Sequence, residues 1–252
     1  MEFKDHFSAR AALYSQFRPH YPDDLFRYVA HLAPRHDVVW DCATGSGQAA
    51  TGLSRYFAKV IATDASEKQI AMASPHGGVE YRVATAEASG ITPTSVDVVT
   101  VAQALHWFDH ESFYNEVRRV VKPDGAIAAW GYGDPIIDDD AVDRIVHDFN
   151  RGTIENYWKP ERDLILAGLR TIPFPFREVA APAMMLECTW TLDELAGYMR
   201  TWSATAAYAA EHGVDPVEQV EEDLRSAWGG EEKRRLIQWP LHIRAGYLDM
   251  SE

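Results

Sequence analysis

The segment of residues 41–48 (DCATGSGQ) holds the side chains and glycines best suited to bind a ligand. Gly45 and Gly47 allow the backbone to turn tightly and to approach a bound molecule closely. An apolar run at residues 38–40 precedes the segment, and apolar residues at helical spacing follow it. The pattern therefore predicts a strand, a ligand-binding loop and a helix in succession.

A second acidic residue, Asp64, ends the next apolar run, at residues 60–63, and comes 17 residues after Gly47. At this distance a carboxylate that ends the second strand can accept hydrogen bonds from both hydroxyls of a ribose. The glycine pair and Asp64 together predict a cofactor that contains adenosine.

Two classes of adenosine cofactor fit this loop. Residues 45–50 (GSGQAA) also satisfy the Gly-x-Gly-x-x-Gly/Ala pattern of dinucleotide-binding proteins, which makes an NAD(P)-dependent oxidoreductase one interpretation. Asp41 favours S-adenosylmethionine, because a carboxylate at the end of the first strand attracts its ammonium and sulfonium groups. A pyrophosphate instead prefers a helix N-terminus without opposing charge. A structural turn that binds no ligand is a third interpretation.

The elements that must position these residues alternate along the first half of the chain. Apolar runs predict strands at residues 38–40, 60–63, 79–83, 96–101 and 126–130, and helical stripes separate them. This order is typical of an α/β fold with a doubly wound, mostly parallel sheet. Further strands at residues 177–188 and 236–243 complete seven strands, the last of them antiparallel. We expect a single domain over residues 1–252, with an N-terminal lid at residues 1–33 and a helical cap inserted at about residues 191–228.

Composition restricts the class of partner. The net charge of −14, from 38 acidic and 24 basic side chains, disfavours a phosphate backbone as ligand, so we expect no nucleic-acid partner. Cys42 and Cys188 lie far apart and match no metal or redox spacing. The acidic run at residues 138–140 is typical of a solvated helix N-terminus, and we assign no metal site. Without an apolar run of membrane-spanning length or a leader pattern at the first residues, a cytoplasmic protein without a membrane partner is expected.

Several segments together resemble the class I S-adenosylmethionine-dependent methyltransferases. The similarity is greatest to methyltransferase type 11 proteins and their trans-aconitate methyltransferase-like branch, and it covers most of the chain in fixed order. The matching stretches are residues 14–22, 41–47, 62–66, 84–87, 103–108 and 121–125, with weaker similarity at 157–160 and 173–176. The resemblance implies a methyltransferase with S-adenosyl-L-methionine as cofactor and a small-molecule substrate.

The resemblance also implies roles for individual residues. The loop would hold the methionine half of the cofactor, Asp64 the ribose, and the residues after the third strand the adenine; Gln103 would lie near the sulfonium. The full cofactor-binding set is Asp41, Ala43, Gly45, Gly47, Asp64, Ala65, Thr85, Ala86, Glu87 and Gln103. Ala43 stands where the family usually has glycine, and Thr85 where it usually has aspartate. These two departures keep a non-catalytic cofactor-binding homologue among the alternatives.

The chemistry at the methyl group depends on the acceptor. An acceptor carboxylate needs no base, whereas a hydroxyl must lose a proton. His106, after the fourth strand, is the candidate catalytic residue, although a histidine that packs against the cofactor is an equal alternative. Tyr14 and Arg18 belong to the N-terminal segment, and Arg18 could clamp a carboxylate or form a surface salt bridge. Trp107 and Trp158 complete the predicted substrate-binding set.

Overall fold

A computed structural model describes residues 17–230 and 232–248 of the chain. Five parallel strands form the first half of the sheet, in the spatial order β3-β2-β1-β4-β5. Their bounds are β1 Val38–Cys42, β2 Lys59–Asp64, β3 Val79–Val83, β4 Val96–Ala102 and β5 Val121–Tyr132. The order reverses between β1 and β4, and ligands of open α/β sheets bind outside the carboxyl ends of strands at such a point.

The second half of the sheet is built on one long antiparallel strand. Strand β9, Arg235–Tyr247, pairs antiparallel with β5 and also with three shorter strands. These are β6 Ile136–Ile137, β7 Arg177–Val179 and β8 Met184–Trp190. Among residues 17–230 and 232–248 the sheet therefore has nine strands, and the predicted number of seven was wrong. The single strand predicted at residues 177–188 is two strands, because Pro182 between them has no N–H to donate to a ladder.

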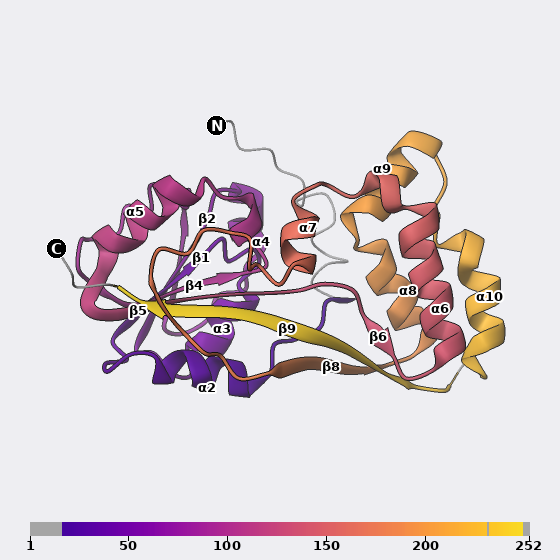
Figure 1. Ribbon diagram of the computed structural model, residues 1–252, viewed down its shortest axis with the longest axis horizontal. Coiled ribbons are helices and arrows are strands. Elements are labelled where there is room, and N and C mark those ends of the chain that lie inside the picture. The colour runs from indigo at the N-terminus through magenta and orange to yellow at the C-terminus, as the bar shows by residue number, and fades with distance from the viewer. Residues whose placement is uncertain (1–16, 231, 249–252) are drawn as a thin grey trace.

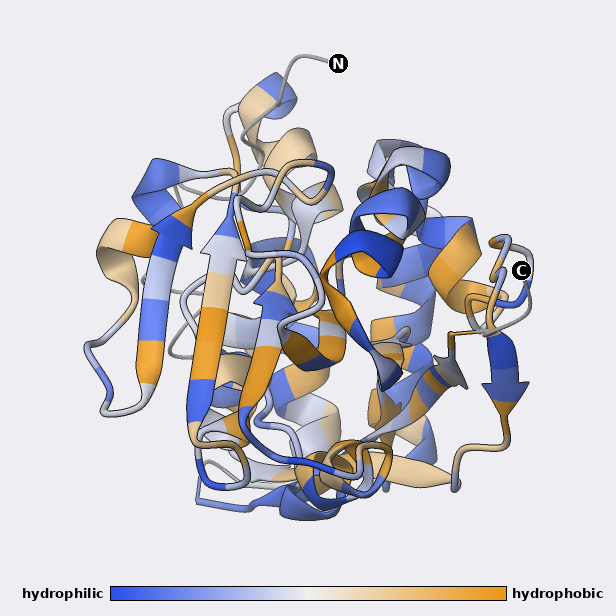
Figure 2. Cartoon of the chain, turned by 90° about the vertical axis from the view of Figure 1, so that its left-hand side faces the viewer, coloured by the Kyte–Doolittle hydropathy of each residue, from blue (hydrophilic) through white to orange (hydrophobic). Residues whose placement is uncertain are grey.

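Helices cover both faces of the parallel strands. Helices α2 (Asp23–His31) and α3 (Gln48–Leu53) contribute apolar side chains to one core, and α5 (His110–Val120) contributes to the other. Helix α4 (Glu67–Met72) contacts β2 and β3. Successive residues of β1, Val39 and Trp40, belong to opposite cores and are both fully buried. Figure 2 shows the hydrophobic residues concentrated along strands inside the sheet, as expected of strands buried on both faces. The doubly wound α/β class is confirmed.

A helical cluster occupies the end of the molecule beyond β6 and β8 (Figure 1). Helices α8 (Leu192–Arg200), α9 (Ser203–His212) and α10 (Glu218–Trp228) lie between β8 and β9 in the chain. Helix α6 (Asp140–Asp148) packs against α10, so the cluster also includes a segment from before β7. Within the described ranges, no helix combines the length and the apolar character that crossing a membrane requires.

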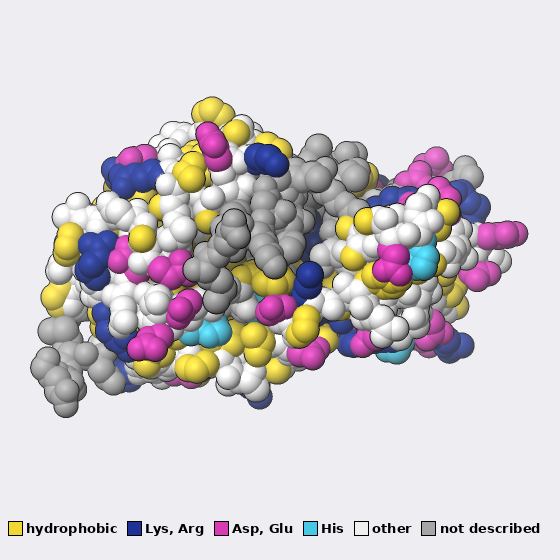
Figure 3. Space-filling model, turned by 90° about the horizontal axis from the view of Figure 1, so that it is seen from above, with side chains coloured by type: hydrophobic (Ala, Val, Ile, Leu, Met, Phe, Trp, Pro, Cys, Tyr) yellow, Lys and Arg dark blue, Asp and Glu magenta, His cyan; other side chains and the backbone are white. Residues whose placement is uncertain are grey.

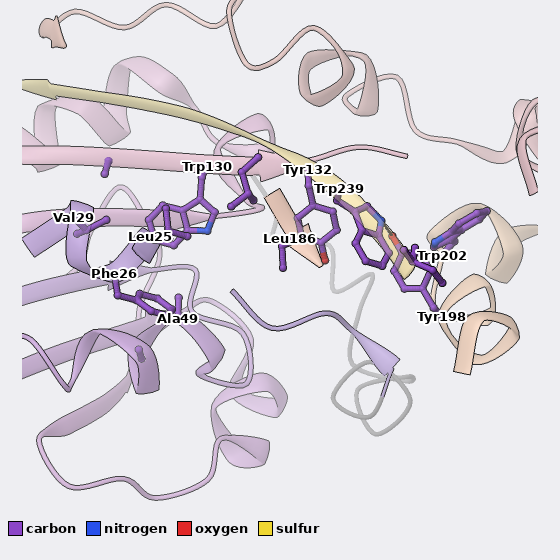
Figure 4. Close-up of a cluster of buried hydrophobic side chains, with 14 of the residues drawn as sticks. Leu25, Phe26, Val29, Ala49, Trp130, Tyr132, Leu186, Tyr198, Trp202 and Trp239 are labelled. Atoms are coloured by element: carbon purple, nitrogen blue, oxygen red, sulfur yellow. Dashed lines mark hydrogen bonds between the residues drawn. The ribbon is translucent and has the colours of Figure 1, made fainter. Parts of the chain in front are cut away.

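Buried aromatic residues connect the sheet to the helical cluster. The ring of Tyr132, at the end of β5, lies 6.2 Å from that of Trp239, which lies 5.3 Å from Tyr198 of α8. Trp202 continues the row, 5.6 Å from Tyr198 (Figure 4). Edge-to-face contacts of this kind stabilise beyond the area that they bury. The ends of the strands and the cluster are therefore packed as one body.

Candidate active site

The loop between β1 and α3 turns on three residues with left-handed backbone angles. These are Ala43 (φ 55°), Gly45 (φ 57°) and Gly47 (φ 90°), and the amide of Thr44 between them donates to the carbonyl of Thr63 on β2 (2.9 Å). The glycines adopt this region without cost, whereas it costs an alanine roughly 1–2 kcal/mol. Ala43, which stands where the family usually has glycine, is therefore a strained residue in this loop.

Asp41 is a fully buried carboxylate at the end of β1. It accepts hydrogen bonds from the hydroxyls of Thr44 (2.5 Å) and Thr100 (2.9 Å). Burial, with a smaller contribution from the nearby charge of Asp64, raises the pKa of Asp41 to about 6. A buried carboxylate in this state gains from a neighbouring cation.

Asp64 ends β2 and joins the two strand ends. Its carboxylate accepts the amide of Gly45 (2.9 Å) and the amide of Ser66 (2.8 Å), and the residue is 9% exposed. Ala65 follows directly. Asp41, Asp64 and the loop thus form one acidic, backbone-lined group at the carboxyl ends of β1 and β2.

The segment after β3 presents its three predicted residues differently. Ala86 is buried, Glu87 is half-buried, and Thr85 is exposed and forms an isolated bridge with Ala88. Glu87 lies close enough to β1 for its charge to help raise the pKa of the buried Cys42 thiol. This segment therefore borders the acidic group on the β3 side.

Gln103 follows β4 and is also left-handed (φ 55°). Its side-chain amide donates to the carbonyl of Tyr132 (3.0 Å), and its side-chain oxygen accepts the amide of Tyr132 (3.2 Å). The carboxamide is thus directed at the end of β5. The position after β4 agrees with the sequence prediction, but the partner on β5 was not foreseen.

His106 and Trp107 lie on the short helical turn Leu105–Trp107, with their rings 4.6 Å apart. His106 is 7% exposed, and within the described part of the chain its Nδ1 makes no hydrogen bond. Burial, with repulsion from His110, lowers the pKa of His106 to about 4. The imidazole is therefore neutral at neutral pH and is a weak base.

Arg18 lies between the sheet and the helical cluster. It donates to the hydroxyl of Tyr132 (3.3 Å), and its guanidinium carbon lies 5.3 Å from the ring centre of Tyr198. Gln48 of α3 donates to the carbonyl of Pro19 (3.0 Å). This part of the N-terminal segment therefore contacts the glycine-loop helix, β5 and α8. Tyr14 lies outside the described residues.

Trp158 belongs to a polar network at the seam between β5 and α7 (Arg162–Leu166). Its ring nitrogen donates to Asn150 (2.8 Å), and the guanidinium of Arg162 lies 4.0 Å from its ring centre. Arg162 also pairs with Asp134. The ring of Trp158 is 6.0 Å from Trp202, which connects it to the aromatic row but not to the glycine loop.

The residues that link these groups were not predicted from the sequence. Tyr132 and Asp134 follow the predicted strand at 126–130, where ligand-facing residues of a parallel sheet occur, and that position was the available signal. Tyr198, Asn150 and Arg162 come from helical segments far along the chain and had no such signal. No trio of His, Cys, Asp or Glu side chains in residues 17–230 and 232–248 is arranged to hold a metal ion.

The fold and the position of the acidic glycine loop at the carboxyl ends of β1 and β2 define a Rossmann-like α/β protein. A methyltransferase domain family matches residues 40–129. A Dictyostelium discoideum protein named as a methyltransferase is 32% identical over 96% of this chain and 94% of its own length. A solved structure described as a type II methyltransferase, from Anaeromyxobacter dehalogenans, is 44% identical, covers 92% of this chain and 98% of its own, and superposes with a TM-score of 0.86.

A Saccharomyces cerevisiae protein named as an S-adenosylmethionine-dependent methyltransferase is 30% identical over half of this chain, which spans 46% of that relative's length. The chain belongs to the class I S-adenosylmethionine-dependent methyltransferases. Of the cofactor interpretations that the loop allowed, this family supports S-adenosylmethionine over a dinucleotide. The trans-aconitate methyltransferase-like branch stays a prediction.

Proposed function

We propose that this methyltransferase transfers a methyl group to a small-molecule carboxylate or hydroxyl at the carboxyl ends of β1, β4 and β5. The proposal rests on the position of Arg18. Its guanidinium donates a hydrogen bond to the hydroxyl of Tyr132 at the end of β5 and lies 5.3 Å from the ring centre of Tyr198 on α8. A guanidinium in this position is suited to bind an acceptor carboxylate.

The residues present fit S-adenosylmethionine on chemical grounds. Asp41 and Asp64 concentrate negative charge beside a loop whose backbone comes close to any ligand. Asp41 would favour the cationic methionine half and Asp64 the ribose, with Ala65, Thr85, Ala86 and Glu87 toward the adenine. The cofactor supplies the electrophilic methyl group when it is bound.

The protein's part in methyl transfer is to orient the acceptor and to exclude water. Arg18 would hold the acceptor carboxylate, and Trp107 and Trp158 would supply apolar surface around it. For a hydroxyl acceptor His106 would take the proton, but a base is most effective when its pKa lies near the working pH. The low pKa of His106 therefore supports a carboxylate as the first choice.

We propose further that residues 1–33 act as a lid and that the helices within residues 191–228 act as a cap in the same domain. Support comes from residues 17–21, which lie between α3 and α8. The phenyl ring of Phe17 packs on Gly197, where a Cβ atom would come within 2.7 Å of it. Tyr21 packs on Trp130 with ring centres 5.7 Å apart.

The test is transfer of a labelled methyl group to matched acceptors, each small carboxylate paired with an amide and an alcohol of the same shape. The variants are Arg18→Gln and His106→Ala, with exposed Arg144→Gln as the matched control. Loss of a charge-assisted hydrogen bond should lower kcat/KM for carboxylates by about 10- to 100-fold in Arg18→Gln. Equal methylation of carboxylates and their amides, or equal loss in Arg144→Gln, would rule out the carboxylate.

A further inference from the structure

Gln103 is held in place from three directions at the junction of β4 and β5. Its backbone amide donates to the carbonyl of Trp130 (2.8 Å). Its carboxamide exchanges hydrogen bonds with both backbone groups of Tyr132 (3.0 and 3.2 Å). The backbone pairing of β4 with β5 ends at Ala102 and Trp130. Beyond that point the side chain of Gln103, in place of the β4 backbone, makes the next hydrogen bonds to β5.

The surrounding residues accommodate this arrangement specifically. Gln103 has a left-handed backbone (φ 55°), which residues other than glycine adopt at a cost. Gly131 lies against its carboxamide, and a Cβ atom at residue 131 would be 2.8 Å from the Oε1 atom of Gln103. Ile165 of α7 fills the other side of the same position, 3.7 Å away. We call the two hydrogen bonds between the Gln103 carboxamide and the backbone of Tyr132 the amide clamp. It explains both the left-handed backbone of Gln103 and the lack of a side chain at Gly131.

The clamp connects two groups that the proposed reaction needs. The turn that carries His106 and Trp107 begins two residues after Gln103. On the other side, the hydroxyl of Tyr132 accepts the hydrogen bond from Arg18. The carboxamide therefore fixes the spacing between the segment after β4 and the residue on which Arg18 lies.

We propose that Gln103 is a positioning residue that sets the relative placement of cofactor and acceptor through Tyr132, rather than a contact to the sulfonium. This inference rests on the proposed function. It assigns the carboxamide a role in orientation, and a misplacement of about 1 Å can lower a rate by about 100-fold.

A sulfonium contact and a positioning role predict different results for Gln103→Glu. A carboxylate near a sulfonium would strengthen binding of S-adenosylmethionine relative to S-adenosylhomocysteine, which has no sulfonium charge. A positioning role predicts an unchanged ratio of the two affinities, because the new carboxylate oxygen faces the carbonyl of Tyr132. The clamp is then broken in Gln103→Glu as it is in Gln103→Ala.

The experiment measures calorimetric affinities for both cofactor forms, amide exchange at Tyr132, and kcat and KM for an acceptor found in the methyl-transfer screen. Gln103→Ala, Gln103→Glu and Gly131→Ala should each speed exchange at Tyr132 roughly tenfold and lower kcat about 10- to 100-fold, with KM for the cofactor little changed. Gly152→Ala is the control, because nothing lies within 4 Å of a Cβ atom there.

The double variant Gln103→Ala/Gly131→Ala should be no worse than Gln103→Ala alone, because the added methyl group no longer meets the carboxamide. A raised affinity ratio in Gln103→Glu, or unchanged exchange at Tyr132 in Gln103→Ala, would overturn the positioning role. Failure of the wild-type chain to bind S-adenosylhomocysteine would instead refute the proposed function itself.

Discussion

Two acidic side chains, Asp41 and Asp64, give the carboxyl ends of β1 and β2 their chemical character. Asp41 is fully buried and its pKa is raised to about 6, while Asp64 accepts two backbone amides that join the ends of β1 and β2. Desolvation makes the ionised form of Asp41 costly unless a positive group lies nearby. A cationic cofactor would repay that cost, whereas a pyrophosphate would add to it.

The affinity for S-adenosylmethionine should therefore depend on pH through Asp41. As the pH falls through about 6, Asp41 takes up a proton and loses its attraction for the cofactor, so the affinity should fall by up to about tenfold per pH unit. The stability of the unliganded protein should change in the opposite direction. The folded state binds more protons than the unfolded state between pH 4 and 6, so stability should decrease as the pH rises through that range.

Calorimetric titrations between pH 5 and 8 check this prediction, with Asp41→Asn as the control that lacks the titrating group. A flat affinity profile in the wild-type chain, or the same slope in Asp41→Asn, would show that Asp41 does not face the cation.

Ala43 offers a second test at this scale. Its left-handed backbone costs roughly 1–2 kcal/mol, which glycine at this position would remove. Glycine also makes the unfolded chain more flexible, which lowers the free energy of unfolding by about 0.4–1 kcal/mol. Ala43→Gly should therefore raise the free energy of unfolding by up to about 1.6 kcal/mol, measured by urea denaturation. Ala43→Val should lower it, and destabilisation by Ala43→Gly would mean that the methyl group contributes packing instead of strain.

Individual elements were predictable to different degrees. Strand β3 has the predicted bounds, residues 79–83, and α8 begins next to residue 191, where the helical segment was predicted to start, with a capping box formed by Thr191 and Glu194. The split between β7 and β8 was missed although Pro182 marks it. Helix α7 was missed because its five residues are too few to show a period. The links through Gln103, Tyr132 and Tyr198 depend on tertiary packing, which no local pattern in the chain encodes.

The N-terminal segment should respond to the cofactor. Residues 17–21 contact α3, β5 and α8 through Gln48, Tyr132 and Tyr198. A lid that completes a site becomes more ordered when the ligand binds. Amide exchange in residues 17–21 should therefore slow on addition of S-adenosylhomocysteine, while exchange in α10 stays constant. Equal exchange with and without the ligand would reduce the segment to structural packing.

In the whole molecule, the residues of the proposed site and a buried ion pair lie at opposite ends of the parallel strands. The proposed cofactor and acceptor sites lie at the carboxyl ends of the parallel strands, and the amino ends of β1 and β4 contain a buried ion pair that the sequence did not predict. Asp97 is 2% exposed and accepts the amides of Asp37 (2.9 Å) and Val38 (2.8 Å) and the amine of Lys122 (2.7 Å). Acidic and basic side chains are interspersed among the described residues of the face in Figure 3.

Removal of the Asp97 carboxylate should lower stability without affecting the site. Asp97→Ala leaves the amides of Asp37 and Val38 without their acceptor, while the amine of Lys122 keeps its hydrogen bond to Asp37 (3.2 Å). The change should cost about 1–3 kcal/mol of unfolding free energy. The protein that remains folded should bind S-adenosylhomocysteine with unchanged affinity. Denaturation and calorimetry test the two parts separately, with exposed Asp124→Ala as the control. A loss below about 1 kcal/mol, or a weaker affinity, would contradict this separation.

We propose that an S-adenosylmethionine site lies at the carboxyl ends of β1 and β2, and calorimetry of S-adenosylhomocysteine binding to the wild-type chain and to Asp64→Ala measures whether it does. The wild-type chain should bind S-adenosylhomocysteine and not NADH. Asp64→Ala should weaken that binding by about 1.5–3 kcal/mol, tenfold or more, because the ribose loses its charged hydrogen-bond acceptor. Tight binding of NADH, or an affinity for S-adenosylhomocysteine that does not change in Asp64→Ala, would show that the cofactor does not bind at these strand ends.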